Sequence, residues 1–76
     1  MKAFDDIVFE QLGIPKESIK DSLTPNDVPN WDSMNYLLFI AELEEEYGIC
    51  FSMDEVLSAN TLGAIKEHVR AKGVSI

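Results

Sequence analysis

Residues 32–48 read DSMNYLLFIAELEEEYG and contain the strongest helical pattern in the chain. Asp32 and Ser33 are both preferred residues for a helix start, and Gly48 is a typical stop. Apolar residues recur between them at spacings of three and four, which predicts one buried face of an amphipathic helix. This core-facing set comprises Tyr36, Phe39, Ile40, Leu43 and Tyr47.

A second apolar group falls on roughly the opposite face of the same predicted helix. A chain of 76 residues has room for one modest core, so this second face has no obvious place to be buried. We therefore expect a docking surface for partner proteins beside Ser33, unless the preceding loop covers it. The group comprises Met34, Leu37, Leu38 and Ala41.

Three consecutive glutamates, residues 44–46, lie near the predicted C-terminal end of this helix. Negative charge at that end opposes the helix dipole and costs roughly 0.3 to 1 kcal/mol for each unscreened charge. Two interpretations stay open. The glutamates form a solvated face, or they contact partners, with Glu44 and Glu45 as the candidates.

The residues before this helix predict a shorter helix followed by a long loop. Apolar spacings of three and four indicate a helix over residues 2–12, and Gly13 and Pro15 are suited to end it. Residues 16–31 are rich in turn-forming residues and predict an ordered loop, with a short helical turn allowed within residues 16–21. Single apolar residues should pin this loop across the core, namely Ile19, Leu23, Val28 and Trp31.

The residues after Gly48 predict two more helices. Ser52 and Glu55 have the spacing of a capping box, which predicts a short helix through Ser58. Thr61 can cap a last helix that ends at Gly73. The expected fold is an all-α four-helix bundle with a long loop between helices one and two and a short third helix, forming a single domain over residues 1–76.

Charge and hydropathy narrow the classes of partner. Fourteen acidic residues against six basic ones give a formal charge of -8, which repels nucleic acid and anionic lipid and favours transient docking to basic proteins. Apolar runs are too short to cross a bilayer, and the first residues lack the pattern of a signal peptide. We expect a cytoplasmic monomer without a nucleic-acid partner and without membrane insertion.

Few residues in the chain suit catalysis or metal binding. Cys50 is the only cysteine, which excludes an intramolecular disulfide, and we expect it to be a small buried hydrophobe. His68 is the only histidine and falls on the polar side of the last predicted helix, where we expect it to be solvated. Because no nucleophile is paired with a base and no metal-ligand pattern occurs, the sequence predicts neither an enzyme nor a metal site.

Ser33 is the residue best placed for chemistry. It lies in the predicted first turn of a helix, where free backbone amides and the positive end of the helix dipole favour a phosphate group. The position alone does not settle a function, since a serine at a helix start is commonly only a cap.

The combination of Asp32-Ser33-Met34, an apolar helix, and the ending Leu43-Glu-Glu-Glu-Tyr-Gly-Ile49 resembles the acyl carrier protein family. The resemblance spans nearly the whole chain, including the long loop and the short third helix. It implies that Ser33, next to Asp32, receives covalent 4′-phosphopantetheine from coenzyme A through a phosphopantetheinyl transferase. Acyl groups would then travel as thioesters on the cofactor's thiol, loaded by a ligase or synthase and passed to acyltransferases.

Departures from the family pattern favour a specialised carrier. Asn35 and Leu38 stand where carriers of fatty acid synthesis are often acidic, and the stretch from Trp31 to Asn35 is similar to discrete bacterial carriers used outside that pathway. An aminoacyl or peptidyl carrier would share the same serine and arm. An unmodified acidic interaction module is the alternative from another class, and modification of Ser33 separates it from the carriers.

Overall fold

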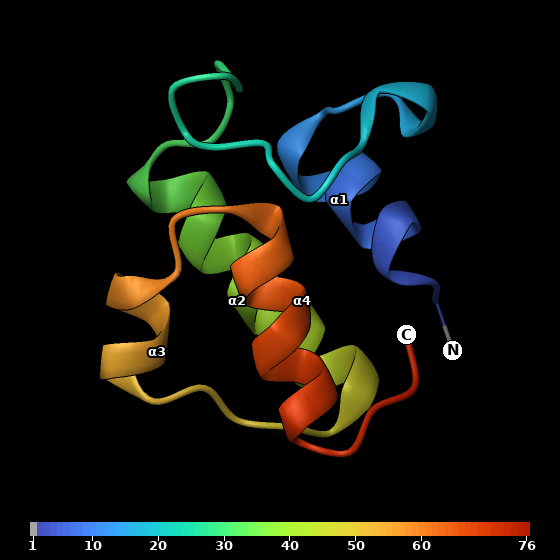
Figure 1. Ribbon diagram of the computed structural model, residues 1–76, viewed down its shortest axis with the longest axis vertical. Helices are drawn as coiled ribbons and strands as arrows, with labels where there is room; N and C mark the ends of the chain where they lie inside the picture. The colour runs from blue at the N-terminus through green and yellow to red at the C-terminus, as the bar shows by residue number, and fades with distance from the viewer. Residues whose placement is uncertain (1) are drawn as a thin grey trace.

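The helix that begins at Ser33 is the longest in the described chain and runs from the upper left to the lower right of Figure 1. The computed structural model describes residues 2–76, and this part of the chain contains helices and no strand. Its elements are α1 (Phe4–Leu12), the 3₁₀ turn η1 (Lys16–Ser18), α2 (Ser33–Tyr47), α3 (Met53–Ser58) and α4 (Leu62–Ala71). The all-α class, the long loop before α2 and the short third helix are confirmed.

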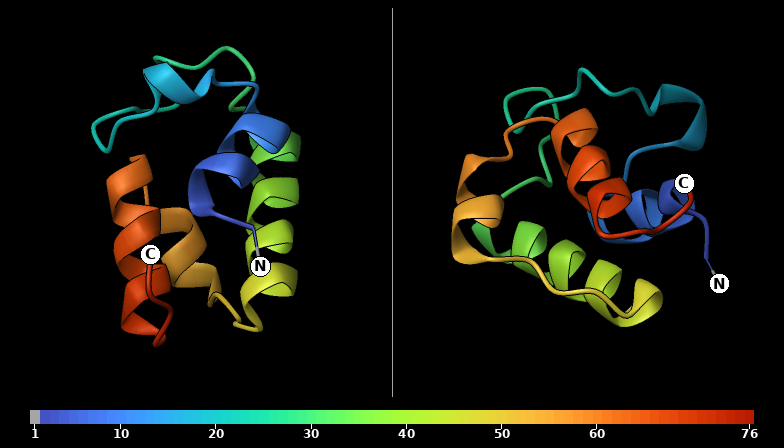
Figure 2. Two further views of the ribbon diagram at one scale, coloured as in Figure 1. Left: turned by 90° about the vertical axis from the view of Figure 1, so that its right-hand side faces the viewer. Right: turned by 60° about the horizontal axis from the view of Figure 1, so that its bottom comes forward.

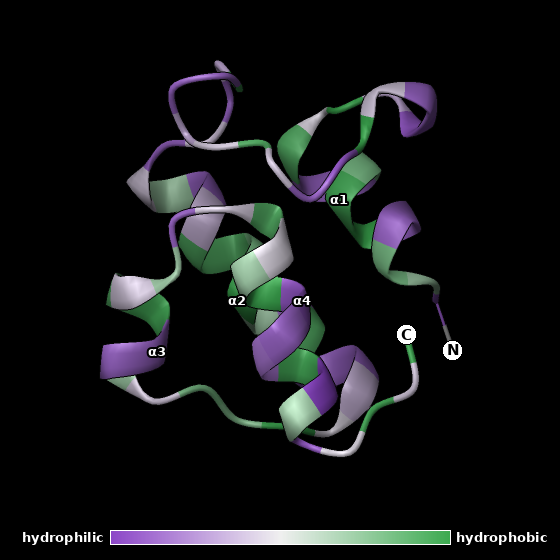
Figure 3. Ribbon diagram, viewed as in Figure 1, coloured by the Kyte–Doolittle hydropathy of each residue, from purple (hydrophilic) through white to green (hydrophobic). Residues whose placement is uncertain are grey.

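The core lies where α1, α2 and α4 face one another. From α2 it takes Phe39, Ile40 and Leu43, while Tyr36 and Tyr47 flank them half-buried, as the helical spacing predicts. Apolar residues recur along all three helices in Figure 3. Figure 2 shows α3 on the side of the bundle between α2 and α4. The other helices contribute Phe4, Ile7, Val8, Leu12, Leu62, Ile65 and Val69.

The long loop between α1 and α2 is pinned to the core, as expected. Val28 and Trp31 are buried, and Ile19 and Leu23 pack partly buried against the core. The loop also holds the start of α4, because the amide of Leu62 donates to the carbonyl of Leu23 at 3.1 Å. Such bonds satisfy backbone amides that a helix start leaves without a partner.

The helix ends follow the capping residues read from the sequence, with small shifts. The capping box of α3 is complete, with both Ser52–Glu55 hydrogen bonds present, and Thr61 caps α4. Gly48 adopts a φ of 66°, the left-handed conformation that ends α2. The last helix ends at Ala71, two residues before the predicted Gly73.

The first helix starts at Phe4 rather than at residue 2, because Lys2 is bound to the end of α2. Its backbone amide donates to Glu46 at 3.1 Å, and its carbonyl accepts from the hydroxyl of Tyr47 at 2.9 Å. The two ends of the described chain lie close together here. Lys2 and Ile76 line one open hollow of ≈ 410 Å³.

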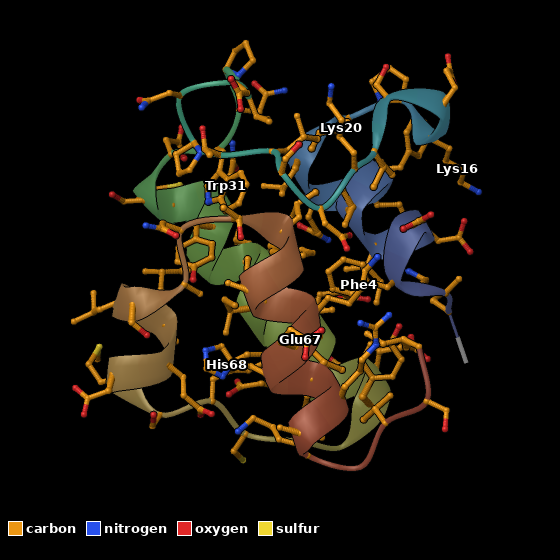
Figure 4. All side chains as sticks on the ribbon, viewed as in Figure 1. Phe4, Lys16, Lys20, Trp31, Glu67 and His68 are labelled. Carbon is orange, nitrogen blue, oxygen red and sulfur yellow. The ribbon has the colours of Figure 1, made fainter. Side chains whose placement is uncertain are left out.

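Two predictions about single residues were wrong. Cys50 is exposed, because in the irregular segment between α2 and α3 its neighbours Ile49 and Phe51 are the residues that pack against the core. His68 is half-buried rather than solvated: its Nδ1 lies 3.4 Å from Oε2 of Glu55, and its ring meets Phe51 edge-on. Figure 4 shows His68 directed toward α3, which covers this side of α4.

Candidate functional site

Ser33 is the first residue of α2 and is exposed. The cap of the helix is Asp32, whose carboxylate accepts a 2.9 Å hydrogen bond from the amide of Asn35. The side chain of Asn35 in turn donates to the carbonyl of Asn30 at 2.8 Å and fixes the loop before the helix. Because Asp32 makes the capping bond, the Ser33 hydroxyl is not needed for it.

An open hollow of ≈ 290 Å³ lies beside Ser33, between the start of α2 and α3. Trp31 and Tyr36 form an aromatic wall, with their rings 5.9 Å apart and tilted by 40°. Figure 4 shows Trp31 where the long loop meets α2. The hollow is therefore largely apolar next to an exposed hydroxyl. Its other lining residues include Pro25, Val56, Leu57, Ala59 and Asn60.

Tyr36 connects α2 to α3 at the edge of this hollow. Its hydroxyl donates a 2.6 Å hydrogen bond to the carbonyl of Val56 in α3. Partial burial raises the pKa of Tyr36 above its ordinary value, so the hydroxyl keeps the proton that this bond needs. Sequence reasoning placed Tyr36 in the core and missed this contact.

The second apolar face of α2 is open to solvent, and the loop does not cover it. Met34, Leu37 and Leu38 are 73%, 58% and 52% exposed, and Ala41 is exposed as well. Two further exposed apolar side chains, Met53 and Leu57, lie one turn apart on α3. Their spacing of four residues in a short predicted helix is the sequence signal for this second exposed apolar pair.

Charge is distributed unevenly around the site. Residues 21–65 contain nine acidic residues and no basic one, giving -9 over 45 residues, while the remaining 31 residues sum to +1. Within the described residues, Asp21 pairs with Lys66, Glu42 with Lys2 and Glu55 with Lys72. No ion pair there reaches Asp32 or Glu45. A simple count of charge along the chain would have found this asymmetry.

The glutamates that end α2 have three different surroundings. Glu44 is half-buried and accepts a 2.8 Å hydrogen bond from the amide of Phe51, so it closes the turn after the helix. Glu46 binds the amide of Lys2, and Glu45 is exposed. The triplet is thus neither a uniform solvated face nor a uniform binding surface.

Neither a metal site nor a membrane span is found in the part of the chain that the structure describes. There, no three His, Cys, Asp or Glu side chains gather as metal ligands would. No helix over residues 2–76 has the length and apolar character needed to cross a membrane.

A comparison with models of known protein families gives a match over most of the chain. The family model described as "phosphopantetheine attachment site" aligns with residues 3–69, from the start of α1 into the last turns of α4. An exposed hydroxyl at the start of α2, where helix amides favour a phosphate, fits such a group sterically and electrostatically. The match confirms the resemblance to the acyl carrier proteins. The chain belongs to the phosphopantetheine attachment family, whose domains carry covalent 4′-phosphopantetheine and serve as carriers rather than catalysts.

Proposed function

We propose that this chain holds 4′-phosphopantetheine on Ser33 and shuttles thioester-bound acyl intermediates between biosynthetic enzymes of the cytoplasm. One observation carries the choice of residue. Asp32 makes the capping bond of α2, so Ser33 presents an exposed hydroxyl that the helix does not use. The proposal treats residues 1–76 as a single carrier domain.

The modification requires little of the protein beyond presenting this hydroxyl. The Ser33 oxygen forms a phosphodiester with the phosphopantetheine part of coenzyme A, its proton passes to the transferase, and adenosine 3′,5′-bisphosphate leaves. The amides of the first turn of α2 and the helix dipole favour the negative charge of the product. The arm supplies the thiol that carries the acyl group. Asp32 lies next to the attachment point and holds the turn that presents it.

The exposed face of α2 is the proposed docking surface for the enzymes that modify, load and unload the carrier. Apolar side chains that remain in solvent gain most from burial in a partner's groove. Glu45, and the oxygen of Glu44 that does not bind Phe51, would add acidic contacts at its end. The expected partners are a phosphopantetheinyl transferase, an acyl-loading ligase or synthase, and acyltransferases. The apolar part of this surface comprises Met34, Leu37, Leu38 and Ala41.

Intact-mass spectrometry tests the proposal. Incubation with coenzyme A and a broad-specificity transferase should add one phosphopantetheine group to the wild-type protein and none to Ser33→Ala. Ser58→Ala is the matched control, because Ser58 is an exposed serine at the end of α3 and should leave modification unchanged. Addition that persists in Ser33→Ala would overturn the site. No addition to the wild type would favour an unmodified interaction module.

A further inference from the structure

Helix α3 is held in place by few contacts. None of its side chains is fully buried, and both Met53 and Leu57 point into solvent. Polar contacts connect it to the rest of the molecule at two of its residues, Val56 and Glu55. The Val56 carbonyl accepts the bond from Tyr36. The Glu55 carboxylate pairs with Lys72, the residue after α4, at 2.9 Å and lies 3.4 Å from Nδ1 of His68. Loss of the contacts at either residue should therefore loosen α3 locally.

Tyr36 stands at the boundary between the hollow beside Ser33 and the core. It lies one turn after Ser33, and the buried Phe39 and Ile40 follow it at i+3 and i+4 on the same helix face. Its ring packs against Trp31 and lines the hollow. A chain that starts at Ser33 and heads for the core between α2 and α3 meets this ring first.

We infer that Tyr36 keeps an acyl chain on Ser33 out of the core. Its ring acts as a plug between the hollow and the core, and its hydroxyl holds α3 closed over that point. An acyl chain on Ser33 therefore stays exposed to solvent and does not enter the core. The inference rests on the proposed attachment at Ser33. It makes Tyr36 a specificity-determining residue, since the carrier gains no stability from long acyl chains.

Thermal melts of loaded protein test the plug. The transferase is supplied with acetyl- or octanoyl-coenzyme A to load wild-type, Tyr36→Phe and Tyr36→Ala proteins. The acetyl and octanoyl forms of the wild type should melt at the same temperature. In Tyr36→Ala the vacated space is continuous with the hollow, so the octanoyl form should melt about 5 °C or more above the acetyl form. Tyr36→Leu replaces Tyr36→Ala if the latter does not fold.

Hydrogen exchange on the unmodified protein tests whether the Tyr36 hydroxyl holds α3, and it requires no acyl group on Ser33. In Tyr36→Phe the amides of α3 should exchange about five-fold faster or more, because one hydrogen bond that holds the helix is lost. Tyr47→Phe is the matched control. Its hydroxyl also donates a bond from α2, to Lys2 at 2.9 Å, but it lies at the other end of the helix and should leave α3 exchange unchanged.

The two measurements separate the inference from the function on which it rests. An octanoyl chain that raises the wild-type melting temperature as much as that of Tyr36→Ala would overturn the plug. Equal α3 exchange in Tyr36→Phe and Tyr47→Phe would overturn the closure by the hydroxyl. If no arm is added to any variant, the proposed function fails and the role in cargo fails with it, while the exchange data still decide whether Tyr36 holds α3.

Discussion

The carboxylate of Asp32 accepts a 2.9 Å hydrogen bond from the amide of Asn35, three residues further along the chain. This bond gives the two neighbouring residues at the start of α2 different roles. Asp32 completes the backbone hydrogen bonding of the first turn, and Ser33 is left to present its hydroxyl. Structural and chemical effects of substitution can therefore be measured separately at adjacent positions.

The first prediction concerns this cap. Asp32→Ala should lower the free energy of unfolding by about 0.5 to 2 kcal/mol, the usual effect of losing an N-cap. Asp32→Asn keeps an acceptor for the Asn35 amide and should stay close to wild type in a urea titration. If Asp32→Asn is as unstable as Asp32→Ala, the charge rather than the hydrogen bond stabilises the turn. Slower modification of Asp32→Asn at unchanged stability would assign the carboxylate a contact with the transferase.

Adjacent residues of α2 should respond in opposite ways. Leu38 is 52% exposed and Phe39 is fully buried. Leu38→Glu should leave the free energy of unfolding within about 0.5 kcal/mol of wild type and change the rate of loading by the cognate enzyme. Phe39→Ala should cost about 3 to 5 kcal/mol through the cavity it creates. Normal loading of a folded Leu38→Glu protein would exclude Leu38 from the docking surface.

Acid should weaken the contact between α3 and α4. Hydrogen bonds from the Ser52 amide and from Lys72 lower the pKa of Glu55 from 4.5 to about 2. Since the folded-state pKa is depressed, the stabilisation is complete above pH 4.5 and is lost as the pH falls toward 2. Melting temperatures of wild type and Glu55→Gln should differ near neutral pH and converge in acid. Glu45→Gln, at an exposed position, controls for general charge effects.

Salt should stabilise the protein. At an ionic strength of about 0.01 M the screening length is about 30 Å, longer than the molecule's 28 × 25 × 20 Å extents, so all of its like charges repel. At about 0.15 M the screening length falls to about 8 Å and the melting temperature should rise. The melting temperature of a double variant, Glu45→Gln with Asp54→Asn, should rise less over the same change in salt, because this variant carries two fewer negative charges. A melting temperature that does not change with salt would show that ion pairs already offset the charge.

The helices could be predicted because their signals are local. The spacing of Phe39, Ile40 and Leu43 predicts one buried helix face, and Ser52 with Glu55 predicts a helix start. Neither prediction requires knowledge of the rest of the chain. The error at Cys50 has the opposite origin. Its exposure depends on which residues of the irregular segment after α2 meet the core, and amino-acid composition cannot predict that.

The exposed serine and the apolar face of α2 could likewise be predicted, but the contacts around them could not. The Tyr36 hydroxyl finds Val56, twenty residues away, only because α3 packs beside the start of α2. Glu44 binds the Phe51 amide through a turn whose path the sequence leaves open. Both bonds join residues that only the tertiary fold brings together, so the helical periodicity of the sequence cannot predict them.

The hollow that Lys2 and Ile76 share has a practical consequence. Both ends of the described chain leave the fold at one corner, and Figure 1 shows this corner away from the start of α2. A dye, an affinity tag or a surface linker attached at either end would therefore leave Ser33 facing the bulk solution. Protein immobilised through either end could be titrated with candidate enzymes, and binding equal to that of the free protein would indicate that this corner takes no part in recognition.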